Sequence, residues 1–455
     1  MPAAAPAAAP LATVVVVTWN GERWLRPCLQ ALARQRTSFP FVVWVVDNAS
    51  TDGSVELLER EHPEVRVLRN SANLGYAGGN NTALREVTTP YAVLLNNDAA
   101  PEPDWLERLL APFAAPEGAR RAAVTSKVLF APRYLRLSLA TEGFVPGGAD
   151  ARELGVRVAS VRLDGEDVTS RVLWEALTWG PEGEGPGRSW WTRPSGELLV
   201  PLPEGATDGP HEVVLRWAAE RDKPVRLGWD GGGTTLAASA APSDARLEVP
   251  AGVPGVDVVN NAGSVVRTAG YGVDRGYQQV DVGQYDEPCD VFALCGCAVA
   301  LRTEAGRAVG WFDDDFFLYY EDTDLAWRLR AAGWTVRYEP SAVVRHLHAA
   351  STVEWSPSFV FHTHRNRLLM LVKCATARRA LFEVGRYPLT TGSTALRTLR
   401  TAARARRRPA VRPTLLRLRV LASFVRLLPA VVARRRAADQ VVPRAELERW
   451  LVPSP

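Results

Sequence analysis

Four short runs of mainly β-branched residues alternate with helix-like segments in the first hundred residues, and this alternation constrains the fold more than any other feature. The runs are TVVVVTW, FVVWVVD, VRVLRN and PYAVLLNND, which begin at residues 13, 41, 65 and 90. Helical periodicity follows the first run in GERWLRPCLQALARQ and the second in SVELLEREH. Near-continuous apolar strands alternating with helices are typical of a parallel sheet covered on both faces. The sequence therefore predicts an α/β domain.

Polar residues close three of these strands. Asn20 follows the first, Asp47 and Asn48 end the second, and residues 96–98, Asn-Asn-Asp, end the fourth. Asn and Asp commonly end strands and start turns, which explains one such end better than three. In open α/β sheets, ligands bind outside the carboxyl ends of the strands. We therefore expect a ligand site at this edge.

The middle of the chain has a different texture. Fragments with a period of two, such as GVRVASVRLDG, HEVVLRW and ARLEVP, replace the helical pattern, and Gly and Pro become frequent. This pattern predicts an all-β domain, most simply a sandwich, inserted into the α/β domain. The predicted divisions are 11–143 and 256–370 for the two parts of the α/β domain, 144–255 for the insertion and 371–455 for a basic helical region. The insertion contains six tryptophans, which favour a role in its core over a sugar-stacking platform. They are Trp174, Trp179, Trp190, Trp191, Trp217 and Trp229.

Composition and charge narrow the class of protein. The chain is 47% hydrophobic and 23% charged, as expected for a globular protein. Five unevenly spaced cysteines do not form a disulfide framework or a zinc motif, so we expect buried thiols in a reducing compartment. MPAAAPAAAP has no basic n-region, and the sequence predicts a cytoplasmic protein without a secretory leader.

The C-terminal region carries a concentrated positive charge. Residues 371–455 contain nineteen Lys or Arg and four Asp or Glu, and LLRLRVLASFVRLLPAVVARRR within them mixes Leu and Val with Arg. An interfacial helix at 415–436 on an anionic membrane surface, on the inner face of the plasma membrane, fits this pattern, with Pro429 expected to interrupt a long helix. A packed helical subdomain with a solvated arginine face is the alternative. Few aromatic residues accompany the arginines, so nucleic-acid binding is not expected.

Residues 313–334, DDDFFLYYEDTDLAWRLRAAGW, combine carboxylates with aromatic residues. Glu321, Asp322 and Asp324 fall in the first turn of a predicted helix that ends at Gly333. Stabilisation of the helix dipole and an i,i+4 pair of Asp324 with Arg328 would explain one or two of these acids. They do not explain the three acids at 313–315. A carboxylate kept ionised at a helix N-terminus suits a general base that accepts a proton from a hydroxyl.

Five motifs together resemble glycosyltransferase family 2, most closely its bacterial rhamnosyltransferase-like and galactofuranosyltransferase-like members. They are TWNG at 18–21, VVDNASTDGS at 45–54, NLGYAGGNN at 73–81, LLNNDA at 94–99 and FFLYYEDTDLAWRLRAAGW at 316–334. The insertion and the C-terminal region lie outside the resemblance. The resemblance implies a GT-A fold that transfers a sugar from a nucleotide-diphospho-sugar with inversion. The nucleotide-binding half would be 11–143 and the catalytic and acceptor half 256–370.

The resemblance also implies a set of donor-binding residues. Asp47 would contact the base or ribose, and the glycine-rich segment would lie along the nucleotide and donor sugar, where glycines allow close backbone approach. Its glycines do not match the dinucleotide fingerprint, so a Rossmann site is not favoured. The implied donor residues are Thr18, Asn20, Asp47, Asp52, Asn73, Gly75, Gly78, Gly79, Asn80, Asn96 and Asn97.

The same resemblance implies a divalent metal, Mg²⁺ or Mn²⁺, held against the diphosphate. Asp98 matches the last acid of the family's metal motif, and His346 matches a metal-ligand position, although a lone histidine is often structural. Asn96 stands where many members have Asp, which removes one negative charge from the motif. His348 would be a neighbour that faces the acceptor.

Asp322 aligns with the family's catalytic base, with Glu321 as its nearest competitor. Trp311, Asp313 and Asp315 would line the acceptor side. We expect a transferase that acts on a cell-envelope glycan or lipid-linked saccharide, with dTDP-rhamnose as the donor or else a UDP-hexose or UDP-galactofuranose. The alternative is a catalytically idle glycan-binding protein that uses the β insertion.

Overall fold

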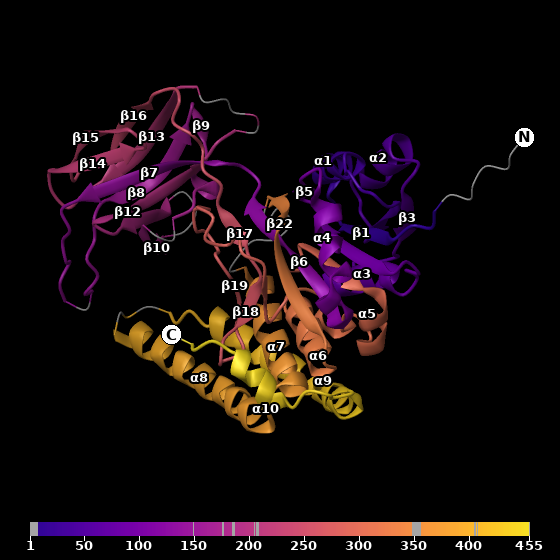
Figure 1. The fold of residues 1–455 in the computed structure, drawn as a ribbon. Coiled ribbons are helices and arrows are strands. Elements are labelled where there is room, and N and C mark those ends of the chain that lie inside the picture. Colours follow the sequence, from indigo (N-terminus) through magenta and orange to yellow (C-terminus); the bar gives the residue numbers. More distant parts are fainter. Residues whose placement is uncertain are drawn as a thin grey trace, which may run out of the picture. The chain divides into compact units, whose positions relative to one another are not determined.

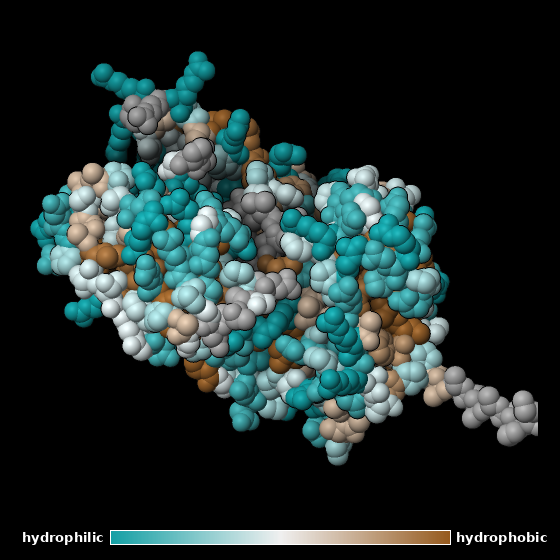
Figure 2. Space-filling model, turned by 90° about the horizontal axis from the view of Figure 1, so that it is seen from above, coloured by the Kyte–Doolittle hydropathy of each residue, from teal (hydrophilic) through white to brown (hydrophobic). Residues whose placement is uncertain are grey.

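The computed structural model describes residues 8–454 except 149, 175–176, 184–186, 204, 206–208, 348–355, 405 and 407. The chain forms two compact units. The first, here the α/β unit, comprises Met1–Leu129, Asn260–Tyr277 and Gly283–Pro455, and the second, here the β unit, comprises Phe130–Val259 and Gln278–Val282. Hydrophilic residues cover most of the face shown in Figure 2.

A ten-stranded mixed sheet forms the centre of the α/β unit, with the order β20-β22-β6-β21-β4-β1-β2-β3 and with β5 and β17 attached to β22 and β6. β1 pairs in parallel with β2 and β4, and β2 with β3, whereas β21 runs antiparallel to β4 and β6. The strands are β1 Ala12–Thr18, β2 Phe41–Asp47, β3 Arg66–Arg69, β4 Tyr91–Asn96, β5 Ala99–Pro101, β6 Arg121–Phe130, β17 Val259–Asn261, β20 Cys289–Asp290, β21 Ala298–Arg302 and β22 Thr335–His346. Two short strands, β18 Ser264–Val266 and β19 Gly272–Asp274, form a separate hairpin.

Helices pack on this sheet through apolar faces. Leu25 of α1, Leu57 of α2 and Trp105 of α4 share one fully buried core with Val14 and Val16 of β1. The helices are α1 Glu22–Ala33, α2 Ser54–Glu61, α3 Gly75–Leu84, α4 Trp105–Ala114, α5 Thr303–Val309 and α6 Glu321–Ala331 (Figure 1). All five cysteines are free, and three of them are buried. The α/β architecture expected from the strand pattern is confirmed.

The β unit consists of two antiparallel sheets around one core, as expected for a sandwich-like insertion. One sheet has the order β10-β11-β8-β13-β16 with β9 beside β8, and the other β12-β7-β14-β15. Leucine and valine side chains from both sheets and Trp217 share the core. The strands are β7 Tyr134–Thr141, β8 Arg157–Leu163, β9 Glu166–Asp167, β10 Thr178–Glu182, β11 Ser189–Thr192, β12 Ser195–Pro201, β13 His211–Ala218, β14 Lys223–Trp229, β15 Gly232–Ala238 and β16 Ser243–Val249.

This unit begins before the predicted boundary at residue 144, because β7 pairs with β12 and β14 and so belongs to its second sheet. Trp190 and Trp217 are buried, and Trp174 stacks on Trp190 with ring centroids 4.9 Å apart. Trp179, by contrast, is exposed. The tryptophans therefore serve mainly as core residues.

The C-terminal region is helical, with α7 Pro357–Cys374, α8 Ala377–Arg404, α9 Arg412–Ala437 and α10 Arg444–Leu447. The expectation that Pro429 interrupts a long helix is wrong, because α9 continues through it. Proline removes the bond to the carbonyl four residues earlier, here Val425, and both residues are exposed, so water can solvate that carbonyl. Within the described ranges, no helix is both long enough and apolar enough to cross a membrane.

Candidate active site

The strand register gathers the predicted polar residues at one edge of the sheet. Thr18 of β1 lies opposite Asp47 of β2, and Val17 lies opposite Asn96 of β4. The Asn97 side-chain amide donates to the Thr18 hydroxyl at 3.0 Å, across the gap between these strand ends. The parallel pairing therefore places the three polar strand ends together, as the sequence predicted.

The turn after β2 holds its own polar side chains. The buried Asp47 carboxylate accepts from the Ser50 amide at 3.2 Å, and the Asn20 side-chain oxygen accepts from the Thr51 amide at 2.7 Å. Asp52 accepts from the Ser54 hydroxyl at 2.6 Å. Burial raises the pKa of Asp52, but the hydrogen bonds from Ser54 and other donors outweigh burial and hold the pKa below its usual value. Asn20 and Asp52 thus brace the turn that presents Asp47.

Gly75 begins α3 at a point where the backbone closely approaches the loop before α6. Its φ is +71°, and a Cβ at this position would lie 2.2 Å from the Phe317 carbonyl oxygen. The Tyr76 amide donates to the same oxygen at 2.7 Å. Asn73 stabilises this start of the helix, because its side-chain oxygen accepts from the Gly75 amide at 2.8 Å. Only glycine tolerates both the positive φ at position 75 and the close approach of the Phe317 oxygen.

Three of the predicted donor residues are packing residues in the structure. A Cβ on Gly79 would lie 2.7 Å from side chains of Asn48 and Val17, and one on Gly78 would lie 2.8 Å from Leu74. The Asn80 side chain is 1% exposed and donates to the Tyr76 carbonyl within the same helix. Gly79 therefore allows α3 to pack closely against Val17 of β1 and Asn48 after β2. Donor contact at Gly78, Gly79 and Asn80 stays a prediction.

Asp98 and His346 are brought together by the pairing of β5 with the end of β22, where His346 lies opposite Ala99. The His346 Nε2 is 3.1 Å from Asp98 Oδ1, and both side chains are buried. His346 Nδ1 lies 3.2 Å from the Asn260 side-chain oxygen, a contact that holds the ring with Nε2 toward Asp98. Asn96 Nδ2 lies 3.4 Å from the same Nε2.

This pair fits one side of a divalent metal site. Carboxylate oxygen and imidazole nitrogen are both suitable ligands, and the contact between Nδ1 and Asn260 is the kind that orients a metal-binding histidine. Among the described residues, no group of three or more His, Cys, Asp or Glu side chains could hold a metal ion. A metal at Asp98 and His346 would therefore take its other ligands from a bound molecule or water, as Mg²⁺ commonly does. His348 lies outside the described residues.

Glu321 and Asp322 open α6 with different environments. Glu321 is 6% exposed and its Oε2 has no partner among the described atoms. Burial, reinforced by the neighbouring Asp322, raises the pKa of Glu321 well above its usual value. Burial also raises the pKa of half-buried Asp322, to about 6, against the effect of hydrogen bonds from the Thr323 and Gly296 amides. A pKa of about 6 leaves Asp322 mostly ionised near neutral pH, and burial shifts the pKa of Glu321 in the same direction.

The loop that presents this acid pair contains three residues in the left-handed region: Phe317, Tyr319 and Tyr320, with φ of 57°, 68° and 70°. Such conformations persist only where the surroundings hold them. The Asn366 side-chain amide of α7 donates to the carbonyls of Phe316, Leu318 and Tyr319 at 2.7, 2.9 and 2.7 Å. Helix α7 thus fixes the backbone that precedes Glu321.

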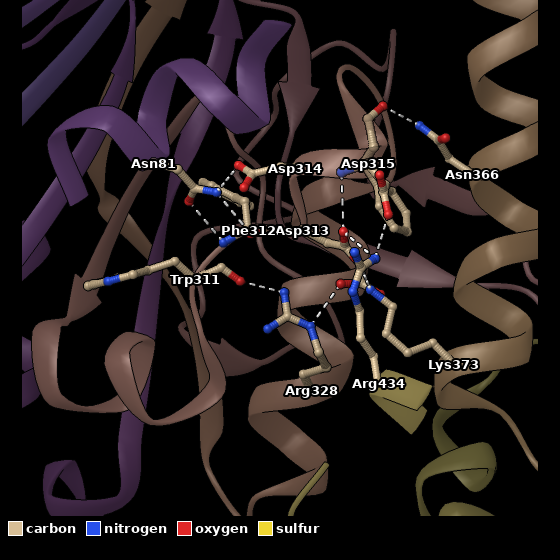
Figure 3. A network of polar contacts seen from close by, with 12 residues as sticks. Asn81, Trp311, Phe312, Asp313, Asp314, Asp315, Arg328, Asn366, Lys373 and Arg434 are labelled. Atoms are coloured by element: carbon tan, nitrogen blue, oxygen red, sulfur yellow. Dashed lines mark hydrogen bonds and ion pairs between the residues drawn. The ribbon is translucent and has the colours of Figure 1, made fainter. Parts of the chain in front are cut away.

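The residues expected on the acceptor side are engaged elsewhere (Figure 3). Asp313 is buried and forms ion pairs with Lys373 of α7 and with Arg434 of α9, the latter at 2.8 Å. Asp315 pairs with the same Arg434 at 2.6 Å. The ring of Trp311 is buried, and a Cβ on Gly306 would overlap it. Trp311, Asp313 and Asp315 therefore hold the loop in position, and their place on the acceptor side stays a prediction.

Two contributors to the site were missed by sequence reasoning. Asp274 of β19 is one of the charges that raise the pKa of Asp322, and its Oδ1 accepts from the Asn261 amide at 2.6 Å. Tyr76 donates its hydroxyl to the Gly296 carbonyl, and the amide of Gly296 donates to Asp322. Tyr76 lies inside the NLGYAGGNN motif and could have been singled out, whereas no sequence pattern marks Asp274.

Comparison with known proteins identifies the N-terminal half of the α/β unit. Residues 13–137 match the model of glycosyl transferase family 2. The N-acetylglucosaminyl-diphospho-decaprenol L-rhamnosyltransferase of Mycobacterium tuberculosis is 40% identical over 78 residues, which are 17% of this chain and 25% of that protein. The teichoic acid poly(glycerol phosphate) polymerase of Staphylococcus epidermidis is 33% identical over 90 residues, 19% of this chain and 12% of that protein. The chain thus matches a quarter or less of the length of these relatives.

Among solved structures, the mannosyltransferase PcManGT from Pyrobaculum calidifontis in complex with GDP-Man and Mn²⁺ aligns with a TM-score of 0.36 and 15% identity. The alignment covers 97% of this chain and 79% of that chain. The family model, in contrast, spans the strand ends from Thr18 to Asp98 that form the candidate site. Residues 13–137 of this chain are thus similar to glycosyl transferase family 2.

Proposed function

We propose that this chain is an inverting glycosyltransferase. It would move a sugar from a nucleotide-diphospho-sugar to a hydroxyl of a cell-envelope glycan or lipid-linked saccharide. The observation that carries the proposal is the approach of two site halves in one unit. The strand edge with Asp47 and the Asp98–His346 pair meets the Glu321–Asp322 helix start at the contact of Gly75 with Phe317.

In this proposal Asp98 and His346 hold Mg²⁺ or Mn²⁺, and oxygens of the donor diphosphate complete the coordination. The metal would neutralise charge on the nucleoside diphosphate leaving group. Asn96 faces His346 with its amide at 3.4 Å, so the protein supplies one carboxylate here where many family members supply two. Asp47 and the Asn97–Thr18 pair lie at the same edge and would contact the nucleotide.

Asp322 is the proposed general base. A base must be ionised to accept the proton of the acceptor hydroxyl, and a pKa of about 6 leaves Asp322 ionised near neutral pH while retaining basicity. Glu321 is more buried, and burial raises its pKa well above its usual range, so it is the weaker candidate for a carboxylate that must be ionised. The attacking oxygen then displaces the nucleoside diphosphate in one step.

The donor proposed is dTDP-rhamnose, and its support is the 40% identity to a rhamnosyltransferase over part of the N-terminal domain. UDP-hexoses and UDP-galactofuranose are the competing donors. The acceptor class is proposed from the same relative, named for N-acetylglucosaminyl-diphospho-decaprenol, and from the teichoic acid poly(glycerol phosphate) polymerase.

Two isosteric variants test the assignment of the base. Asp322→Asn should lower the transfer rate about 10²- to 10⁴-fold with donor affinity unchanged, because only the proton acceptor is lost. Glu321→Gln is the matched control and should keep most of the activity, since it keeps the size and shape of a side chain that does not accept the proton. Steady-state transfer assays and donor titrations measure both. A large loss in Glu321→Gln with normal turnover in Asp322→Asn would overturn the assignment.

A further inference from the structure

Helix α8 is amphipathic with its apolar side turned outward. Leu381, Phe382 and Leu389 are 75%, 66% and 74% exposed. The residues that α8 buries include polar side chains: Glu383, Tyr387 and Thr391. This is the reverse of a helix that packs on a protein core, where the apolar stripe faces inward.

Polar contacts on the inner side fix this orientation. Glu383 pairs with Arg367 of α7 at 3.3 Å, and the Tyr387 hydroxyl lies 2.9 Å from His364 Nδ1 of the same helix. Arg417 of α9 donates to the Thr391 hydroxyl at 3.0 Å. Rotation of α8 to bury its leucines would break all of these contacts. The exposed apolar side is therefore a fixed feature of the fold.

Exposed apolar side chains are concentrated on α8, α9 and the segment between them. Of the nineteen exposed large hydrophobic residues in the described part of the chain, nine lie between residues 381 and 425. They are Leu381, Phe382, Leu389, Leu396, Leu399, Val411, Leu415, Leu418 and Val425, and we call them the apolar face. Phe382, Leu389 and Leu396 recur at seven-residue intervals, close to two helical turns, so they line one side of α8.

The charge around the apolar face is almost entirely positive. Residues 377–437 contain sixteen arginines and one acid, Glu383, which is buried. Arg378, Arg386, Arg397, Arg400 and Arg404 of α8 are exposed. With 100° per residue, Arg386 and Arg397 project about 40° and 60° away from Phe382, whereas Arg400 falls in line with Phe382 beyond Leu396. Arginines therefore border the leucine stripe.

We propose that the apolar face docks on the surface of an anionic phospholipid bilayer, with α8 lying in the plane of the interface. A fixed apolar stripe bordered by arginines is the pattern of an interfacial helix, and phospholipid headgroups supply the negative charge that the arginines lack. A second copy of the chain would bring arginines against arginines, which opposes self-association through this face. This docking surface extends beyond the proposed enzymatic activity and does not depend on it.

Co-sedimentation of the full chain with vesicles tests the proposal. One set of vesicles contains phosphatidylglycerol and phosphatidylcholine in equal parts, and the other contains phosphatidylcholine alone. We expect tight binding to the anionic vesicles only. The double variant Phe382→Ser with Leu389→Ser should lower the partition coefficient at least about tenfold, because two large side chains lose their burial in the interface. Val145→Ser with Val282→Ser removes exposed apolar side chains from the β unit and is the matched control.

A second pair of variants tests the charge. Arg397→Gln with Arg400→Gln should weaken binding about fivefold per arginine and reduce its sensitivity to salt. Arg34→Gln with Arg36→Gln, near the end of α1, should bind like the wild type. Circular dichroism confirms that each variant is folded. Equal binding to both vesicle types, unchanged binding of the α8 variants, or preference for single-stranded RNA over anionic vesicles would overturn the proposal. The proposal would also be overturned if the wild type bound no vesicles but formed a dimer in sedimentation velocity that the Phe382→Ser with Leu389→Ser variant lost.

Discussion

The turn after β2 and the loop before α6 present the two halves of the candidate site, yet they are held in opposite ways. In the turn, Asp47 bonds to Ser50 and Asp52 bonds to Ser54, so each acid is braced by a residue two or three positions away. In the loop, Asp313 depends on Lys373 and Arg434, which are 60 and 121 residues distant. The acids of the turn after β2 are thus held by near neighbours in the sequence, whereas the loop before α6 is held by the C-terminal helices.

The two regions should differ most in stability when the buried cation Lys373 is removed. Lys373→Met leaves the buried carboxylates Asp313 and Asp324 without their shared partner, and we expect a loss of about 3–5 kcal/mol in the free energy of unfolding. The matched control is Arg66→Met, which breaks an exposed pair with Glu86 and should cost less than about 1 kcal/mol. Urea unfolding measures both. Equal costs would show that the network in Figure 3 does not stabilise the loop.

The junction between the two regions offers the next test. Gly75→Ala and Gly310→Ala both place a side chain at a positive φ, but only the Cβ at Gly75 would meet another backbone atom, the Phe317 oxygen. Gly75→Ala should therefore cost about 1–3 kcal/mol more than Gly310→Ala, because the two backbones must separate. It should also lower the transfer rate. Similar stability and activity in the two variants would contradict a close contact between α3 and the catalytic loop.

The acid pair should give the smallest effect, a change in how stability depends on pH. The folded-state pKa of Asp322 is raised to about 6, so its contribution to stability is fully present below the unfolded pKa and is lost as the pH rises through 6. Asp322→Asn cannot ionise and should lack this loss. The difference in melting temperature between Asp322→Asn and the wild type should therefore increase from acid to mildly alkaline pH. The increase should correspond to about 1–2 kcal/mol in the free energy of unfolding. A pH-independent difference would argue against a buried, weakly acidic Asp322.

Local pattern and distant packing explain which features the sequence could predict. The parallel strands, their polar ends and the acidic start of α6 follow from periodicity and from residues that act on their neighbours. The proximity of Asp98 and His346 was reached only through the family resemblance, because nothing near either residue specifies a partner 248 positions away.

Other contacts could not be predicted for the same reason. Asp313 and Asp315 look like free acids in the sequence, since their partners Lys373 and Arg434 belong to helices far along the chain. Gly79 shares a motif with Gly75 but lies against Asn48 and Val17, and Asn80 donates to the Tyr76 carbonyl within the helix. Pro429 was expected to break α9, because the sequence does not show that the freed carbonyl of Val425 faces water.

The central claim is that this edge of the sheet binds a nucleotide-diphospho-sugar through a metal at Asp98 and His346. Calorimetric titration of dTDP-rhamnose, UDP-galactose, UDP-galactofuranose, UDP-N-acetylglucosamine and GDP-mannose, with and without Mn²⁺, tests it most directly. The account predicts that one donor binds tightly only with Mn²⁺ and that His346→Ala weakens this binding at least about tenfold. Absence of binding for every donor under both conditions would contradict the claim.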